Sequence, residues 1–136
     1  MSLIETYTHN SEGYNPFFIQ VGWQVAQLNY SEEYNINNIF RVDVHYKTDE
    51  IFILTKGSAI LISAKIKDDE IEFEPIRMQI GIVYNIPKNV WHNIAMKENA
   101  EVIIVEKDNT HLNDFEFYNL RDDQKERLIK SVKECF

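Results

Sequence analysis

Acidic and imidazole side chains are grouped in the stretch VDVHYKTDEIFILTKG, which covers residues 42–57. Asp43 and His45 are two residues apart and Lys47 follows at the same spacing, so in an extended strand all three would point to one side. Glu50 comes next, at the start of an apolar run. Imidazole and carboxylate groups that converge can bind a divalent metal ion, and they can also transfer protons as an acid–base pair.

Together with a second stretch, GIVYNIPKNVWHNI at residues 81–94, this segment resembles the two sequence motifs of the cupin superfamily. Those motifs read G-x5-H-x-H-x3–4-E-x6-G and G-x5-P-x-G-x2-H-x3-N. Glu50 and Gly57 match the end of the first motif, and Gly81, Pro87 and His92 match the second without gaps. The resemblance extends over about residues 21–107, which is most of the chain.

The resemblance implies a double-stranded β-helix, the jelly-roll barrel of cupins, with a mononuclear metal site inside it. Cupins usually hold Fe, Mn, Ni, Cu or Zn with three histidines and one glutamate. Here an aspartate stands at the first histidine position, so the implied ligands are Asp43, His45, Glu50 and His92, and the implied cofactor is a divalent ion such as Fe, Mn, Ni or Zn. Glu50 lies an odd number of residues from His45, so a bend near residues 48 and 49 must redirect it into the barrel.

The chain departs from the cupin motifs at three further positions. Asn89 replaces a glycine, which an asparagine can do where the turn needs a positive φ. Met96 stands in place of the final asparagine, and the opening glycine of the first motif has no counterpart. These departures leave the presence of a metal ion open.

Two metal-free interpretations therefore remain. In one, Lys47 supplies the positive charge by pairing with Asp43 or Glu50, and its ammonium opposes a divalent ion by like-charge repulsion. In the other, the apolar residues at 40, 42 and 44 fill the core, and Asp43 and His45 face solvent. Alternation along the strand does not choose between inward and outward polar faces.

Other side chains are assigned by their surroundings in the sequence. We expect Tyr46, Phe52 and Trp91 to line the pocket together with Lys47. His9 and His111 stand alone among polar residues and are expected on the surface.

The pattern of the chain predicts an all-β sandwich or barrel with one short C-terminal α-helix. Short alternating runs joined by turns continue to about residue 118, with a hairpin break near Gly22. The acids at 70, 72 and 74 beside Pro75 indicate a solvated edge strand. Residues 1–16 are expected to form an arm, residues 17–118 the barrel, and residues 119–136 a helix packed on it, begun by a capping box of Asp123 and Glu126.

The amino-acid composition argues against several classes of binding partner. The formal net charge of −8 and the lack of a basic block argue against nucleic acid. The chain has neither a long apolar run nor the features of a signal peptide, and it has no glycine-rich phosphate loop, so we expect no membrane span and no nucleotide cofactor. Its single cysteine, Cys135, suits a reducing compartment, and we expect a cytoplasmic protein.

Three functions are compatible with these features. The first is a metal-dependent enzyme acting on a small molecule, and the second is metal-free acid–base catalysis by His45 or His92 with Lys47 as electrostatic partner. The third is a non-catalytic module that binds a sugar, an acid or another metabolite. The resemblance also implies a homodimer, and the aromatic stretch GYNPFFIQVGW at residues 13–23 is the expected interface.

Overall fold

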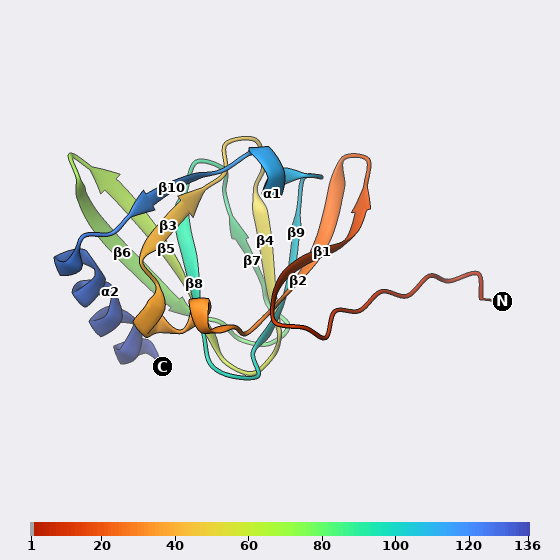
Figure 1. Cartoon of the computed structure of the whole chain (residues 1–136), viewed down its shortest axis with the longest axis horizontal. Helices are drawn as coiled ribbons and strands as arrows, with labels where there is room; N and C mark the ends of the chain where they lie inside the picture. The colour runs from red at the N-terminus through yellow and green to blue at the C-terminus, as the bar shows by residue number, and fades with distance from the viewer. Residues whose placement is uncertain (1) are drawn as a thin grey trace.

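Two antiparallel five-stranded sheets face each other, and one helix covers the outside of one of them (Figure 1). This computed structural model describes residues 2–136, so Met1, the first residue of the expected arm, lies outside the described chain. The elements are β1 (Gly13–Gln20), β2 (Trp23–Asn29), η1 (Glu32–Tyr34), η2 (Ile36–Asn38), β3 (Arg41–Val44), β4 (Glu50–Lys56), β5 (Ala59–Lys67), β6 (Glu70–Arg77), β7 (Val83–Ile86), β8 (Trp91–Met96), β9 (Glu101–Glu106), α1 (Thr110–Asn113), β10 (Glu116–Asn119) and α2 (Asp122–Cys135). The predicted all-β class with a C-terminal helix is confirmed.

The first sheet has the order β1-β2-β9-β4-β7 and the second has the order β10-β3-β8-β5-β6. Alternate residues of each strand point between the sheets and form the main core, because side-chain direction reverses at every residue of a strand. Leu28, Phe52, Ile94 and Ile104 come from four different strands and meet there. The core fills one part of the space between the sheets and leaves the polar ends of several strands around an open cavity.

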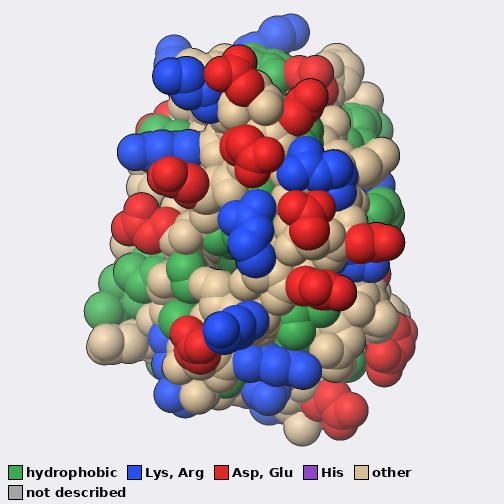
Figure 2. Space-filling model, turned by 90° about the vertical axis from the view of Figure 1, so that its left-hand side faces the viewer, with side chains coloured by type: hydrophobic (Ala, Val, Ile, Leu, Met, Phe, Trp, Pro, Cys, Tyr) green, Lys and Arg blue, Asp and Glu red, His purple; other side chains and the backbone are tan. Residues whose placement is uncertain are grey.

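A second apolar cluster lies between the second sheet and α2. Leu128 and Val132 of α2 are fully buried against Val42, Ile60 and Ile62, which point outward from the sheet. The helical spacing predicted for the tail is therefore confirmed. The exposed side of this end of the molecule carries interspersed acidic and basic side chains, as Figure 2 shows.

The cap of α2 differs from the predicted box of Asp123 and Glu126. The cap lies two residues earlier, with Arg121 as N-cap before Asp122, and the Arg121 backbone N–H donates to Gln124 Oε1 at 2.9 Å. Gln124 also donates to the backbone oxygen of Asp69, so this buried amide joins the helix to the turn between β5 and β6. That tertiary contact selects the cap, and it is invisible in the local sequence.

The N-terminal boundary also differs from the expected one. β1 begins at Gly13, so the position chosen between residues 16 and 17 falls inside a strand. Pro16 lies where the register of β1 against β2 shifts, and β1 is an edge strand, so the missing N–H of proline is tolerated there. The hairpin turns at Gly22, as predicted, with a φ of +95°. The N-terminal end of the arm extends away from the barrel (Figure 1). The rest of the arm contacts the first sheet: Tyr7 packs on Phe18, and Asn29 Nδ2 donates to the backbone oxygens of His9 and Ser11.

Two turn and edge predictions are confirmed, those for Asn89 and for the acids at 70, 72 and 74. Asn89 has a φ of +72°, the left-handed conformation that asparagine accepts in place of glycine. Gly57 has a φ of +76°, and an added Cβ would lie 2.7 Å from the Ala100 Cα, so only glycine fits. The acids at 70, 72 and 74 are exposed on β6, which is an edge strand of the second sheet. Within residues 2–136 no helix has the length and apolar character needed to cross a membrane.

Candidate metal centre

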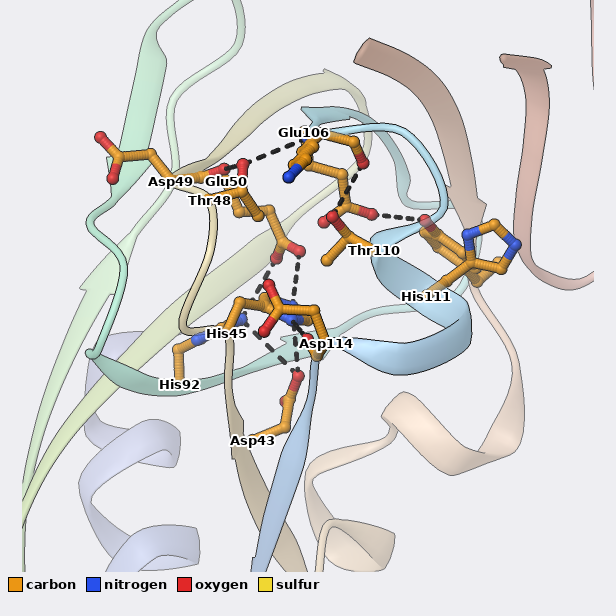
Figure 3. Close-up of polar contacts among 12 residues, drawn as sticks. Asp43, His45, Thr48, Asp49, Glu50, His92, Glu106, Thr110, His111 and Asp114 are labelled. Atoms are coloured by element: carbon orange, nitrogen blue, oxygen red, sulfur yellow. Dashed lines mark hydrogen bonds and ion pairs between the residues drawn. The ribbon is translucent and has the colours of Figure 1, made fainter. Parts of the chain in front are cut away.

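Four polar side chains from three strands converge between the sheets (Figure 3). Asp43 on β3 is directly opposite His92 on β8 in the register of the second sheet. His45 follows β3 by one residue, and Glu50 opens β4 of the first sheet. The structure therefore brings together all four residues that the cupin resemblance implied as ligands.

Both faces of β3 are covered, which resolves the choice between an inward and an outward polar face. Val42 and Val44 are buried on one face, and Val42 lies beneath α2. Asp43 and His45 on the other face line the cavity. The interpretation in which the polar face meets bulk solvent is wrong because α2 supplies a second apolar environment for the valines.

The bend expected near residues 48 and 49 is the crossing from the second sheet to the first. It places Glu50 at the start of β4, where Glu50 and Phe52 point inward and Ile51 points outward. Asp49 holds the loop before β8 by accepting a hydrogen bond from the Lys88 N–H at 2.9 Å. The loop that carries Glu50 and the loop that precedes His92 are thus tied together.

The histidine Nε2 atoms lie between the two carboxylates. Glu50 Oε2 is 3.0 Å from His45 Nε2, and Glu50 Oε1 is 3.1 Å from His92 Nε2. Asp43 Oδ2 is 3.7 Å from His45 Nε2 and 3.8 Å from His92 Nε2. Figure 3 shows Asp43 and Glu50 on opposite sides of the histidine pair.

Backbone carbonyl groups orient both imidazoles. His45 Nδ1–H donates to the backbone oxygen of Asp114 at 2.6 Å, and His92 Nδ1–H donates to the backbone oxygen of Val90 at 2.9 Å. A carbonyl can only accept, so the proton of each neutral ring sits on Nδ1 and the Nε2 lone pair points into the site. The Asp114 carboxylate also accepts the backbone N–H groups of Tyr46 and Lys47, both at 3.0 Å, which holds the chain just after His45.

The charges of this cluster depend on one another. Burial alone would lower the pKa of each histidine, but the Glu50 carboxylate outweighs it and raises the pKa of both His45 and His92 to about 9. Burial would raise the pKa of Glu50, but Glu106, His45 and His92, which lie against it, hold that pKa below its usual value. Burial is also the main reason that the pKa of Asp43 is raised, and the positive charge of His92 opposes it.

The donor geometry fits a single metal ion. Two atoms bound at about 2.1 Å to one ion lie about 3.0 Å apart in octahedral and about 3.4 Å apart in tetrahedral coordination. The four nitrogen–oxygen distances run from 3.0 to 3.8 Å, close to that range. Asp43, His45 and His92 have donor atoms within 4.8 Å of one another and could share an ion as they stand. Glu50 forms a separate group with His45 and Glu106, so it would have to move toward that ion to bind it.

A cavity of about 270 Å³ opens above the four residues. Apolar side chains of the core line its floor, and aromatic side chains line its rim. Phe52 lines it as predicted, with its ring set edge-on to His92. The site is therefore reachable by a small molecule and largely screened from bulk water.

Comparison with protein-family models and with curated proteins finds no match. Solved structures do match. A cupin-2 domain protein from Shewanella frigidimarina is 24% identical, with 73% of this chain and 84% of that one covered and a TM-score of 0.51. A variant of the 3,4-ketoisomerase QdtA from Thermoanaerobacterium thermosaccharolyticum, in complex with TDP-4-keto-6-deoxyglucose, is 20% identical over 90% of this chain and 78% of that one, with a TM-score of 0.53. Streptomyces PAC13, solved with uridine, is 9% identical over 88% of this chain and 96% of that one, with a TM-score of 0.55.

The chain has the cupin fold. In this cupin barrel, three of the predicted pocket residues lie elsewhere, so that prediction is wrong for them. Lys47 is exposed, because the chain leaves the strand after His45 and the alternation of β3 no longer applies to it. Tyr46 is also exposed, with its hydroxyl on Glu116, and Trp91 lies on the α2 side of the second sheet against Tyr118.

The cupin barrel also contains a buried polar network that the sequence did not reveal. Glu106 Oε1 accepts hydrogen bonds from the Tyr14 hydroxyl at 2.6 Å and from Gln24 Nε2 at 3.2 Å. Burial and then the nearby Glu50 raise the pKa of Glu106 to about 8, which favours its protonated form at neutral pH. The inward positions of β9, Val102, Ile104 and Glu106, alternate with period two, and that pattern could have identified this acid.

His111 is the second correction to the sequence-based assignments. It was expected on the surface, but it is half-buried, lines the cavity and contacts Gln24 Nε2 through Nδ1 at 3.2 Å. The short helix α1 folds back over the cavity mouth and carries it there (Figure 3). His9 is also half-buried and lies against Asn15, outside the cavity.

Proposed function

We propose that the protein is a metal-dependent enzyme acting on a small molecule, with one divalent ion held by Asp43, His45, Glu50 and His92. The observation that carries the proposal is that each of the two Nε2 atoms lies 3.0–3.8 Å from carboxylate oxygens of Asp43 and Glu50, with both imidazoles turned by backbone carbonyl groups so that Nε2 faces inward. Such orientation of the ligand imidazoles is a regular property of metal sites.

A bound divalent ion would supply a Lewis acid that polarises a substrate oxygen or a water molecule. The chain itself contributes three effects. Phe52, Ile94 and Ile104 form an apolar floor that limits water around the reacting group. Glu106 holds a proton next to Glu50, and Tyr14 and Gln24 keep its carboxyl group in place.

The mixed donor set also bears on the choice of metal. Two imidazoles and two carboxylates suit Fe, Mn, Ni or Zn, and no thiolate is near. Compared with a site of three histidines, the carboxylate of Asp43 adds one negative charge, so the proposed site favours a divalent cation with a preference for oxygen ligands.

Metal analysis of purified protein tests the proposal. After supplementation with Fe, Mn, Ni and Zn in turn and then dialysis, wild type is expected to retain about one ion per chain. Asp43→Ala and His92→Ala are expected to lose it, whereas His9→Ala, which removes an imidazole outside the cavity, should retain it. Circular dichroism and thermal melting establish that each variant is folded. A folded wild type without stoichiometric metal in any of the four preparations would refute the proposal.

A metal-free binding or acid–base protein is the second candidate, and one observation favours it. With both histidines protonated, their two positive charges balance Asp43 and Glu50 without any ion. This differs from the version in which Lys47 supplies the charge, because Lys47 is exposed. A sugar or 2-oxo acid that stabilises the metal-free protein thermally without being converted would support a binder.

We also propose that the protein is a homodimer. The outer face of the first sheet has a contiguous patch of β-branched residues, in which Val25, Val105 and Ile51 are neighbours in register, as are Ile103 and Ile53. No helix of the described chain covers this face, whereas α2 covers the second sheet. The arm of residues 2–12 projects from the same side of the molecule (Figure 1).

The occupant that best fits this patch is a second copy of the chain. Leu3 and Ile4 in the arm are 99% and 77% exposed, so these two apolar side chains do not pack on the barrel of their own chain. Ile53→Lys and deletion of residues 1–12 are each expected to shift the protein toward monomer in sedimentation analysis. Ile76→Lys, on β6 of the other sheet, is the control. An unchanged size in both altered proteins would refute the proposed dimer.

A further inference from the structure

Among residues 2–136, Arg41 is the only lysine or arginine that lines the cavity. It belongs to β3 and precedes Asp43 by two residues, so both side chains lie on the cavity face of the strand. Its guanidinium carbon is 3.8 Å from the centroid of the Phe117 ring and 5.2 Å from that of Phe40. The two rings hold the guanidinium at the mouth of the cavity.

Within the described residues, the Arg41 side chain has no direct polar partner. Within residues 2–136 its side chain makes no ion pair and no hydrogen bond, whereas Arg121 pairs with Glu70 and Asp123 on the surface. Stacking on an aromatic ring uses the flat face of a guanidinium and leaves the N–H groups at its edge free. Those groups match the paired oxygens of a carboxylate or a phosphate.

The spacing between Arg41 and the four proposed ligands limits the size of the anion. The Cα atoms of residues two apart on a strand are about 7 Å apart. Phe117, on which the guanidinium stacks, pairs with Asp43 in register, so an anion on Arg41 would sit within about that distance of Asp43. This is the length of a short chain or of one ring. The cavity volume of about 270 Å³ agrees with a molecule of that size.

The rim of the cavity also has an apolar component. Phe40, Phe115 and Phe117 line it together with Tyr34, and the rings of Phe115 and Phe117 are 5.1 Å apart. Three of these aromatic residues are partly exposed, at 43–48%, which leaves ring surface available for a ligand. Glu33 is the acidic group at the same rim.

From this arrangement we infer that the substrate is a small organic anion, a carboxylate or phosphate with an apolar ring, whose anionic group binds Arg41 while another oxygen reaches the metal centre. This inference rests on the proposed function for its second contact. The Arg41 contact stands without the metal. Glu33 would repel an anion, so it should limit the affinity of the site.

Calorimetry with defined probes tests the inference on nickel-loaded and metal-free protein. Phenylpyruvate represents the carboxylates and phenyl phosphate the phosphates, and the neutral compounds phenylacetone and phenol are their controls. We expect wild type to bind at least one anionic probe and Arg41→Gln to bind it about 10- to 100-fold more weakly. Arg41→Lys should restore only part of the affinity, and Glu33→Gln should strengthen binding.

Arg77→Gln, which removes an exposed arginine at the end of β6, is the matched control and should bind as wild type does. Metal content measured on each variant separates the two proposals, because Arg41→Gln should still retain the ion. If wild type lacks metal but its anion binding depends on Arg41, the metal proposal fails and the anion site stands. The anion site is overturned if Arg41→Gln binds the anionic probes as well as wild type, if wild type prefers the neutral probes, or if wild type binds no anionic probe at millimolar concentration.

Discussion

Metal-free protein should lose stability between pH 6.5 and 8.5, and the stabilisation by a bound metal ion should grow over the same interval. In the metal-free protein, His45 and His92 have pKa values of about 9, compared with 6.5 for an ordinary histidine. Over this interval the folded chain keeps protons that the unfolded chain has already lost, so raising the pH destabilises the fold. Their stabilising contribution is complete below pH 6.5 and disappears as the pH passes 9.

The size of the effect follows from the shift of 2.5 pH units, which is 9 minus 6.5. Linkage then predicts a loss of about 2 kcal/mol for each histidine between pH 6.5 and 8.5. Both imidazoles depend on the same Glu50 carboxylate, so the pair together should contribute about 2–4 kcal/mol. The raised pKa of Glu106, about 8, acts in the same direction, because the folded state also keeps that proton longer than the unfolded state does.

A divalent ion opposes this trend, because it must displace the Nε2 proton of each histidine. Below a pKa of about 9, its apparent affinity should rise up to about tenfold per pH unit for each proton displaced. The stabilisation by Ni²⁺ should therefore grow by about 2–3 kcal/mol per displaced proton between pH 6.5 and 8.5. Metal-free protein loses stability over the same interval.

Urea unfolding at several pH values, with and without Ni²⁺ held at one free concentration by a metal buffer, measures both trends. Glu50→Gln is the control, since it removes the carboxylate that raises both histidine pKa values and should flatten the metal-free trend. A Ni²⁺-induced stabilisation that stays constant or shrinks as the pH rises would contradict ligation through the two Nε2 atoms.

Three further predictions concern the groups that support the site and the fold. Gly57→Ala should destabilise the protein by about 2–4 kcal/mol in urea unfolding, because the added Cβ would lie 2.7 Å from the Ala100 backbone. Gly13→Ala is the control: its added Cβ has no atom within 4 Å, so it should cost only about 1–2 kcal/mol, from the positive φ. Asp114→Ala should weaken Ni²⁺ binding about 10- to 100-fold in calorimetry, because it frees the chain that positions His45; unchanged affinity would show that the backbone contact is sufficient. Leu128→Ala should cost about 2–5 kcal/mol in urea unfolding while metal content stays unchanged, and a loss of metal would contradict the separation of the two apolar clusters.

Much of the fold was predictable because local rules determine it. Alternation identified the strands, Gly22 and Gly57 marked turns with positive φ, and the spacing of Leu128 and Val132 identified the helix. The resemblance to the cupin motifs selected four residues that the structure brings together. The spacing within the motifs predicts that these residues converge, because it depends both on the number of residues in each strand and on the lengths of the turns between strands.

The errors in the predicted pocket have a common cause. The prediction for Lys47 extended the alternation of β3 beyond its end, and that for Trp91 did not identify which face of β8 the helix covers. Glu106 and His111 were missed because each reaches the cavity through packing between elements that are distant in sequence. A two-residue periodicity shows that the two faces of a strand differ in polarity, but it does not show which face points into the protein.

The amino-acid sequence alone was sufficient to predict the class of fold and the two segments that supply Asp43, His45, Glu50 and His92, because turns, alternation and spacing are properties of contiguous residues. Only the tertiary structure decided that α2 covers one face of β3 while the other lines the cavity, that Lys47 is outside, and that the Arg41 side chain has no polar partner among residues 2–136. The physical reason is that burial, charge pairing and pKa depend on what surrounds a side chain from every direction. Those surroundings exist only when the two sheets and the helix have packed together.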